Sequence, residues 1–444
     1  MEEILKMNNK EDVNQLLIIG NGFDLHCGLE TKFDNYFKAT EPDKDVKTFF
    51  DKSNLNLQLI KKDYFKEQSF WDVYLRLLQS DSIEDWSDVE AQIKNFFTEK
   101  NIVKKLCIKF LITFISNNNQ NFNEFKFEIL KLLKSEYISD DFIEKLYAYV
   151  EQKTFNIQGK NNLNLINLTK KIVSYKDDLN IEKLLNSAKS YMYTFLFNEL
   201  KCFEKNFKSY LSNLFITRHH YEASVKSNFG NMNKKGSRAK IEFSDLKEYN
   251  NKMDKCLELL SENKKYNLLS FNYTYPLEVK ETQKKVLLKE RELDMCNYFV
   301  NVHGRLNKNI IIGIDEKNIN SMDNLYRFTK TYRLFELEDN FNQNYPLQKS
   351  IKQIKFYGHS LAPADYSYFQ SIFDFYHIYD SDVKLIFYYS DYCNDREKCK
   401  FEITNRVIEL IKTYGDTLDN KNHGKNLLHK LKLENRLKIR ELED

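Results

Sequence analysis

Two glycines followed by an acid stand where an apolar run of the sequence ends. The run begins at Gln15, and the residues that end it are Gly20, Asn21, Gly22, Phe23 and Asp24. A glycine after a strand permits a tight turn, and a second lets backbone N–H groups approach a phosphate at the start of the next helix. The next glycine is Gly28, so the full G-x-G-x-x-G spacing is absent. The motif indicates either a nucleotide-binding turn or a purely structural one.

Polar groups also follow three later apolar runs. Asn272 ends one, His303 and Gly304 end the second, and the third is followed by Gly358, Ser360 and Leu361. Ligands of open α/β sheets bind at the carboxyl ends of the strands, so these residues are candidates for one site. An amide could orient a water or a ribose hydroxyl, and an imidazole titrates close to neutral pH. Equally, Asn272 could cap a turn and His303 could be a hydrogen-bonded structural residue.

Strands and helices are expected in different parts of the chain. Between residues 51 and 264 apolar residues recur at spacings of three and four, as in Ile102, Leu106, Phe110 and Phe114, which is typical of helices. A charged helix is expected at Lys425 to Glu443. Short apolar runs predict strands at Gln15–Gly20, Tyr266–Phe271, Tyr298–His303, Ile310–Ile314, Ile354–Gly358 and Val383–Tyr389.

This distribution predicts an α/β fold with one doubly wound, mostly parallel, Rossmann-like sheet and a large helical insertion. We expect residues 1–50 and 265–444 to form a discontinuous nucleotide-binding domain, and residues 51–264 to form a mainly helical insertion domain. Within the insertion, Ser227–Ala239 combines glycine, asparagine, serine and basic residues. It could be a phosphate-binding lid or a solvated loop.

Composition narrows the possible partners. The 444 residues include 68 basic and 65 acidic side chains, so a net charge of +3 gives no general attraction to nucleic acid or to an acidic membrane. No secretory signal and no run of about 18 apolar residues is present, which favours a cytoplasmic protein without a membrane contact. The seven cysteines are scattered and predict reduced thiols. No ligand spacing indicates a metal site.

Several segments together resemble the AbiH family of bacterial abortive-infection (phage defence) proteins. The segment GNGFDLHCGLETKFDNYF carries most of the resemblance, and SFNYT, VHG, IIGID and YGHSLAPADYSYF follow it in the same order. The stretch from Trp86 to Glu90 matches the W-x-x-x-E segment of that family. Two positions depart from the family pattern, because Cys27 stands where histidine is common and Glu30 where proline is common.

The same landmarks are similar, more distantly, to the sirtuin-like NAD-binding fold. In that fold a G-x-G loop, an Asn at a strand end, a His-Gly pair and a late G-x-S-L segment line one NAD pocket. The chain departs from it at Thr274, where the N-x-D pattern has an acid, and at His359, which is unusual in the last segment. The positions that match in order are Gly20, Gly22, Gly28, Leu29, Asn272, His303, Gly304, Gly358, Ser360 and Leu361.

The resemblance implies a phage-defence effector that hydrolyses NAD, as its substrate, at the bond between nicotinamide and ribose. Asn272 and His303 are the expected catalytic residues, with Asn272 orienting a water or ribose hydroxyl and His303 acting as the base. The Gly20–Gly22 backbone would hold the pyrophosphate, and Ser360 would bind a ribose or phosphate oxygen. A phage-derived trigger and a homo-oligomer are possible partners. Deacylation is disfavoured, because a paired C-x-x-C zinc module is missing.

Two other classes of function stay open. A non-catalytic nucleotide-sensing module that controls a partner would keep Gly20 and Gly22 but tolerate the loss of His303. A metal-dependent, nucleic-acid-directed toxin would gather carboxylates around an ion within about 4–6 Å of one another. The carboxylates available for such a cluster are Asp24, Glu90, Asp315 and Asp365.

Overall fold

The chain folds into two compact units. The first takes its residues from Met1–Lys32, Tyr210–Ile311 and Arg333–Asp444, and the second from Phe33–Ser209 and Ile312–Tyr332. The computed structural model describes residues 13–51, 55–78, 86–98, 101–123, 125–137, 140–157, 163–214, 243–282, 285–316, 319–337, 346–392, 394–419 and 424–443.

A six-stranded, all-parallel sheet organises the first unit, in the order β5-β2-β1-β6-β7-β8. Its strands are β1 (Gln15–Ile19), β2 (Tyr266–Ser270), β5 (Cys296–Asn301), β6 (Gln353–Tyr357), β7 (Lys384–Tyr389) and β8 (Leu437–Glu441). Counted along the chain, the order across the sheet is 3-2-1-4-5-6, so it reverses at β1. A separate antiparallel hairpin consists of β3 (Leu277–Thr282) and β4 (Lys285–Glu290).

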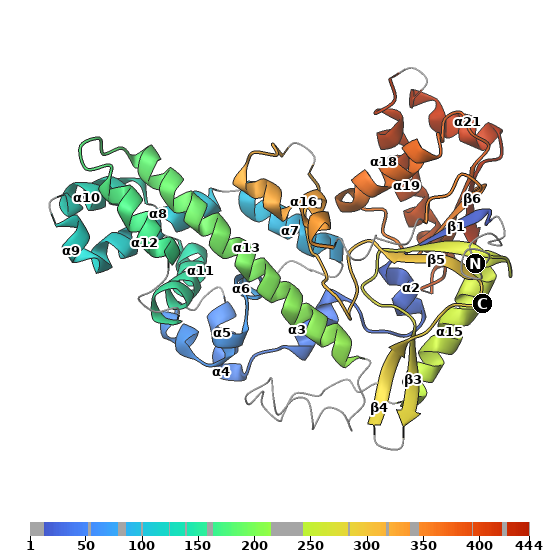
Figure 1. Cartoon of the computed structure of the whole chain (residues 1–444), viewed down its shortest axis with the longest axis horizontal. Coiled ribbons are helices and arrows are strands. Elements are labelled where there is room, and N and C mark those ends of the chain that lie inside the picture. The colour runs from blue at the N-terminus through green and yellow to red at the C-terminus, as the bar shows by residue number, and fades with distance from the viewer. Residues whose placement is uncertain are drawn as a thin grey trace, which may run out of the picture. The chain divides into compact units, whose positions relative to one another are not determined.

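Helices cover both faces of this sheet (Figure 1). Leu16 and Ile18 of β1 face a core that includes Phe369 of α18 and Leu410 of α19. Gln15, which alternates with them, reaches the end of α15 on the opposite face. The helices of the unit are α2 (Asn21–His26), α15 (Phe243–Ser261), η4 (Phe335–Leu337), η5 (Pro363–Asp365), α18 (Tyr366–Phe375), α19 (Arg396–Gly415) and α21 (Leu427–Leu433).

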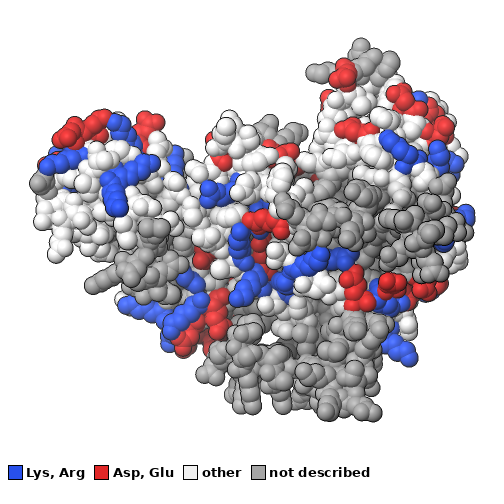
Figure 2. All heavy atoms as spheres, viewed as in Figure 1, with Lys and Arg blue, Asp and Glu red and all other residues white. Residues whose placement is uncertain are grey.

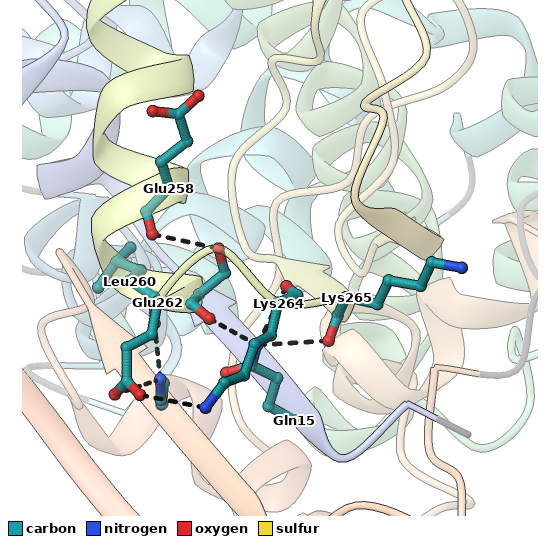
Figure 3. A network of polar contacts seen from close by, with 8 residues as sticks. Gln15, Glu258, Leu260, Glu262, Lys264 and Lys265 are labelled. Atoms are coloured by element: carbon teal, nitrogen blue, oxygen red, sulfur yellow. Dashed lines mark hydrogen bonds and ion pairs between the residues drawn. The ribbon is translucent and has the colours of Figure 1, made fainter. Parts of the chain in front are cut away.

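The end of α15 is held to the sheet by side chains from two strands, as Figure 3 shows. Gln15 of β1 donates from Nε2 to the carbonyl of Ser261 at 2.8 Å. Lys355 of β6 donates from Nζ to the carbonyl of Leu260 at 2.8 Å and pairs with Glu262 at 3.0 Å. The last carbonyls of a helix lack partners within it and carry its negative dipole end. A buried amide and a buried ammonium therefore satisfy groups that would otherwise lose their hydrogen bonds to water.

The second unit is entirely helical apart from one isolated bridge within the described residues. Glu199 of its longest helix, α13, accepts hydrogen bonds from the Phe70 backbone at 2.6 Å and from the Tyr149 hydroxyl at 2.7 Å. The Trp71 indole donates to the Leu196 carbonyl at 3.0 Å. Its helices are α3 (Phe33–Ala39), α4 (Lys44–Phe50), η1 (Leu57–Lys61), α5 (Tyr64–Glu67), α6 (Phe70–Leu78), α7 (Trp86–Thr98), α8 (Ile102–Asn117), α9 (Asn119–Phe122), α10 (Lys126–Glu136), α11 (Asp141–Glu151), the π-helix η2 (Gln152–Ile157), α12 (Leu163–Val173), α13 (Ile181–Asn213) and η3 (Asn324–Phe328). Helix α16 (Lys330–Leu334) spans the boundary between the units.

The expected α/β class, the parallel sheet and the long helical stretch are confirmed. The boundaries in the structure differ from residues 51 and 264, because α3 belongs to the helical unit and α15 to the sheet unit. Residues 312–332 also join the helical unit, where Glu204 accepts a hydrogen bond from the Ile312 N–H at 2.7 Å. None of the helices among the described residues combines the length and the apolar character that a bilayer crossing requires.

Two predicted elements are wrong. Ile310–Ile314 is not a strand, although it is buried and apolar, because only isolated bridges at Ile310 and Ile314 pair it with other backbone. The C-terminal helix ends at Leu433, and β8 follows. In β8, Lys438 and Arg440 alternate with apolar residues, which suits a strand at the edge of a sheet.

Replacing Lys355 with Met should destabilise the sheet unit. The substitution keeps the length of the side chain but leaves the Leu260 carbonyl without its donor and removes the closer of the two ion pairs of Glu262. We expect the free energy of unfolding to fall by about 1–3 kcal/mol. Urea unfolding followed by circular dichroism measures it. The exposed Lys384→Met is the matched control and should change it by less than about 0.5 kcal/mol; equal losses in both variants would contradict the role of Lys355.

Candidate functional site

The loops that follow β1 and β6 lie directly against each other. The Gly22 N–H donates to the Gly358 carbonyl at 2.7 Å, and the Gly20 N–H donates to the Tyr357 carbonyl at 3.1 Å. A Cβ atom at position 22 would lie 2.8 Å from the Gly358 Cα, and one at position 358 would lie 2.2 Å from the Phe23 nitrogen. Gly358 also has φ +68°, in the left-handed region. Both glycines are therefore required by the contact, at the point where the strand order reverses.

Asn272, the amide expected in catalysis, holds the first of these loops. Its Nδ2 donates to the Gly20 carbonyl at 3.1 Å, and its side chain also hydrogen-bonds Asp24. Its own carbonyl accepts from the Asn301 amide at 2.7 Å. The side chain is buried and committed to the end of β1. In this structure it positions the glycine loop.

Asp24 is a fully buried carboxyl group in the first turn of α2. It accepts hydrogen bonds from the Thr274 hydroxyl at 2.7 Å and from the Tyr249 hydroxyl at 3.3 Å. Burial raises the pKa of Asp24 from 3.8 to about 7, because these bonds only partly offset the loss of water. A small cavity of about 10 Å³ adjoins it, lined largely by apolar side chains that include Met253 and Phe299. The carboxyl can exchange a proton near neutral pH.

His303 belongs to a cluster of two imidazoles and one carboxylate. Its Nε2 lies 3.2 Å from Oδ1 of Asp365, and Nε2 of His359 lies 3.3 Å from Oδ2 of the same carboxylate. The three residues come from the loop after β5, the loop after β6 and η5. Phe271 packs edge-on against both imidazoles, with ring centroids 5.4 Å from His303 and 4.4 Å from His359. The cluster is buried in an aromatic environment.

The remaining expected site residues lie in the same loops. Asn21 accepts a hydrogen bond from the Thr31 hydroxyl at 2.6 Å, and the Ser360 carbonyl accepts one from Arg406 at 2.9 Å. The others are Phe23, buried in α2; Gly28, with φ +94° just after α2; Gly304, with φ +92° beside His303; and Leu361, with φ +55°.

The structure therefore brings the four expected strand ends together at one edge of the sheet. Asn272 contacts Gly20, and His359 lies between the Gly20 loop and the His303 cluster. The two expected catalytic side chains have different partners there, because Asn272 contacts the loop after β1 whereas His303 faces Asp365. The segment Ser227–Ala239 lies outside the described residues.

The four carboxylates that a metal-dependent nuclease would need have separate surroundings. Asp24 faces Thr274, whereas Asp365 faces the two imidazoles. In the helical unit, Glu90 forms a buried ion pair with Lys330 at 2.8 Å. Asp315 is partly exposed in that unit. Across the residues that the structure describes, no three His, Cys, Asp or Glu side chains are grouped so that they could hold a metal ion.

Sequence reasoning missed that His303 and His359 both contact Asp365. The residue types were visible, since His359 and Asp365 lie six positions apart in YGHSLAPAD, directly after β6. The second histidine beside Asp365 was not visible, because His303 follows β5, more than 50 positions earlier in the chain. A histidine and an aspartate in one strand-end loop were the available signal.

Comparisons of the chain with protein-family models, with curated proteins and with solved structures found no match. The resemblances to the AbiH family and to the sirtuin-like fold therefore stay predictions.

Asp24→Asn should change how stability depends on pH. Because the folded-state pKa is raised, wild-type protein loses stability as the pH rises from about 4 to about 7, and Asn removes this titration. From pH 5 to pH 8 the variant should gain roughly 2–3 kcal/mol relative to wild type. Urea unfolding at both pH values measures the difference. The exposed Asp177→Asn should show no such gain; parallel pH profiles for wild type and Asp24→Asn would disprove the assignment.

Glu90→Gln should destabilise the helical unit, because it leaves the buried Lys330 ammonium without its counter-charge. We expect a loss of about 3–5 kcal/mol in the free energy of unfolding. The exposed pair of Glu136 and Lys104, at 3.1 Å, offers the matched control, and Glu136→Gln should cost less than about 1 kcal/mol. Thermal and urea unfolding of the three proteins would compare them. Similar values for both substitutions would contradict a structural role of Glu90.

Proposed function

We propose that this protein binds NAD at the carboxyl edge of its parallel sheet and hydrolyses the bond between nicotinamide and ribose. In an infected cell this activity would deplete the cofactor, so the protein would act as a phage-defence effector of the AbiH type. Binding would take place on a Rossmann-like, sirtuin-like arrangement of the sheet. The proposal joins the resemblance in the sequence to one feature of the sheet.

The observation that carries the proposal is the reversal of strand order at β1. The order 3-2-1-4-5-6 is that of doubly wound sheets that bind dinucleotides, and their ligands lie where the order reverses. In this chain the two glycine loops meet at that point, through Gly22 and Gly358. Gly22 and Gly358 have no side chains at this contact, so the two loops lie backbone to backbone beside the proposed pyrophosphate site, with the Gly20 and Gly22 N–H groups bonded to carbonyls after β6.

The neighbouring groups suit the chemistry. Loss of nicotinamide passes through an oxocarbenium-like cation, so the protein needs to position NAD and activate a water or hydroxyl. His303 could accept the proton, since the Asp365 carboxylate beside its Nε2 would stabilise the imidazolium that forms. The sirtuin-like N-x-D pattern has an acid at the position that Thr274 occupies in this chain. Here a carboxyl group lies beside Thr274 and accepts a hydrogen bond from its hydroxyl, but it belongs to Asp24 of α2. This substitution of one acid for another supports the assignment of the pocket.

A nucleotide-sensing module without catalysis is the second candidate. The observation that favours it is the commitment of the Asn272 amide to Gly20 and Asp24, which leaves the amide engaged in holding a loop. Such a module would bind NAD without cleaving it.

A nucleic-acid-directed toxin has less support. On the face drawn in Figure 2, Lys and Arg side chains stand among Asp and Glu side chains and do not form one continuous basic surface. The near balance of 68 basic and 65 acidic residues agrees with this view.

Purified protein incubated with NAD, with and without extract from phage-infected cells, should release nicotinamide. His303→Gln should lower kcat by about 10²–10⁴-fold, because it removes the base, with little change in the KM for NAD. Asn272→Ala should lower both affinity and turnover, because the Gly20 carbonyl loses its donor. Chromatography of free nicotinamide and calorimetric titration with NAD measure the two effects.

His429→Gln, at an exposed position of α21, is the matched control and should behave as wild type. Nicotinamide release that persists in His303→Gln would reject the catalytic assignment. Binding of NAD without release would favour the sensing module. Activity that requires an added divalent metal and acts on nucleic acid would favour the toxin.

A further inference from the structure

Tyr357 contacts the loop and helix after β1 with its backbone and with its side chain. Its carbonyl accepts a hydrogen bond from the Gly20 N–H at 3.1 Å, and its hydroxyl lies 2.9 Å from Nδ1 of His26, the last residue of α2. Its ring packs edge-on against His26, with centroids 5.7 Å apart, and against Phe23. Phe356, the preceding residue of β6, belongs to the core beneath α18 and α19, so the Tyr357 side chain lies on the other face of the sheet.

The same hydroxyl joins α2 to the loop after β7. It donates to Oγ of Ser390 at 3.0 Å. A phenol has one hydrogen, so the bond between this hydroxyl and His26 takes its hydrogen from Nδ1 of the imidazole. The three groups therefore form a directed chain, in which His26 donates to Tyr357 and Tyr357 donates to Ser390. Tyr357 is buried, whereas Ser390, where the chain ends, is partly exposed after the carboxyl end of β7.

A chain of this kind makes its last member a better donor. Hydrogen bonds in series polarise one another, and the Ser390 oxygen, because it accepts from Tyr357, directs its own hydrogen elsewhere. A negatively charged oxygen is the acceptor that suits such a hydroxyl best, because charge-assisted hydrogen bonds are stronger than neutral ones. The neighbouring carboxylate, Asp391, accepts from the Asp395 N–H at 2.7 Å, at the start of α19 on the opposite face of the sheet.

The glycine loops require such a donor if a phosphate is to bind beside them. The Gly20 and Gly22 N–H groups both donate to backbone carbonyls at the end of β6, so these two groups do not serve a phosphate. Ligands of doubly wound sheets lie at the edge where the strand order reverses, which here is beside β1 and β6. Ser390 follows β7, the next strand, and is connected through Tyr357 to the Gly20 loop.

We propose that Ser390 binds a phosphate oxygen of the nucleotide, and that Tyr357, which receives a hydrogen bond from His26, is the positioning residue that directs the Ser390 hydroxyl. The inference rests on the proposed function and deepens it, by assigning a phosphate subsite to the loop after β7. The chemistry that the subsite recognises is a phosphate group, so NAD and inorganic pyrophosphate both serve as probes.

Ser390→Ala tests the subsite by calorimetric titration. Loss of one hydrogen bond to a charged oxygen should raise the Kd for NAD and for pyrophosphate about 10–100-fold. Ser390→Thr restores the hydroxyl and should bind both probes within about 3-fold of wild type. Ser371→Ala, at an exposed position of α18, is the matched control and should behave as wild type.

Tyr357→Phe isolates the chain, because it keeps the ring and removes only the hydroxyl. We expect it to raise the Kd for both probes about 3–10-fold. Added to Ser390→Ala it should cost nothing further, since Tyr357 acts through the Ser390 hydroxyl. Full additivity of the two substitutions would overturn the positioning role. Tyr376→Phe is the matched control, because the hydroxyl of this buried tyrosine accepts from the Gln348 N–H at 3.2 Å.

The outcomes separate the inference from the proposed function. Unchanged affinity for NAD and pyrophosphate in Ser390→Ala overturns the inference, and release of nicotinamide by the same protein would leave NAD hydrolysis standing. Pyrophosphate binding that depends on Ser390, in a protein that neither binds nor cleaves NAD, supports the inference and counts against the hydrolysis. A wild type that binds neither probe overturns both. If Tyr357→Phe does not fold, the comparison of Ser390→Ala with Ser390→Thr decides the subsite.

Discussion

The carboxyl edge of the sheet is organised by one contact between two backbones. The hydrogen bond from the Gly22 N–H to the Gly358 carbonyl contributes on the order of 1 kcal/mol by itself, but the closeness that it demands excludes a side chain at either of these two positions. Asn272 reaches the Gly20 carbonyl only because the loop after β1 is held there. His359 directly follows Gly358, so the same contact also places the imidazole that faces Asp365. The positions of both glycine loops and of the imidazole beside Asp365 thus depend on a single close packing of loops.

Much of the sheet could be predicted from the sequence, for a reason that also explains the errors. β1, β2, β6 and β7 are buried on both faces, so they appear as short, mainly apolar runs ended by polar or glycine residues, with Asn267 and Lys355 as buried polar exceptions. Ile310–Ile314 has the same pattern because it is equally buried, yet its backbone bonds go elsewhere, for example from the Ile311 N–H to the His303 carbonyl. β8 was predicted as part of a helix for the opposite reason. It is an edge strand, and its charged residues Lys438 and Arg440 make its sequence resemble that of the charged helix before it. Burial can be predicted from such patterns, whereas the pairing of backbone groups cannot.

The residues of the candidate site also differ in whether the sequence could predict their roles. Glycine permits a close approach of two backbones, and for that reason Gly20, Gly22 and Gly358 could be identified from the sequence. The partners of Asn272 and His303 could not, because each lies in a different loop whose direction depends on packing after the strand has ended. Alternation along a strand predicts which face a residue occupies, but Asp365 reaches His303 from a short helical turn outside the sheet. The roles of polar residues at strand ends therefore require the fold.

The placement of β1 in the middle of the sheet has a consequence for biosynthesis. Its neighbour β2 is contributed by a segment far along the chain; the bond between Asp24 and Thr274, for instance, joins residues 250 positions apart. At roughly 5–20 residues per second, a ribosome needs tens of seconds to deliver β2 after β1 has emerged. Throughout that time the apolar strand β1 has neither of its neighbours, and its exposed edges could pair with other chains. The helical unit, whose residues between 33 and 209 emerge in the interval, can fold first and bring the two ends of the unfinished sheet unit towards each other.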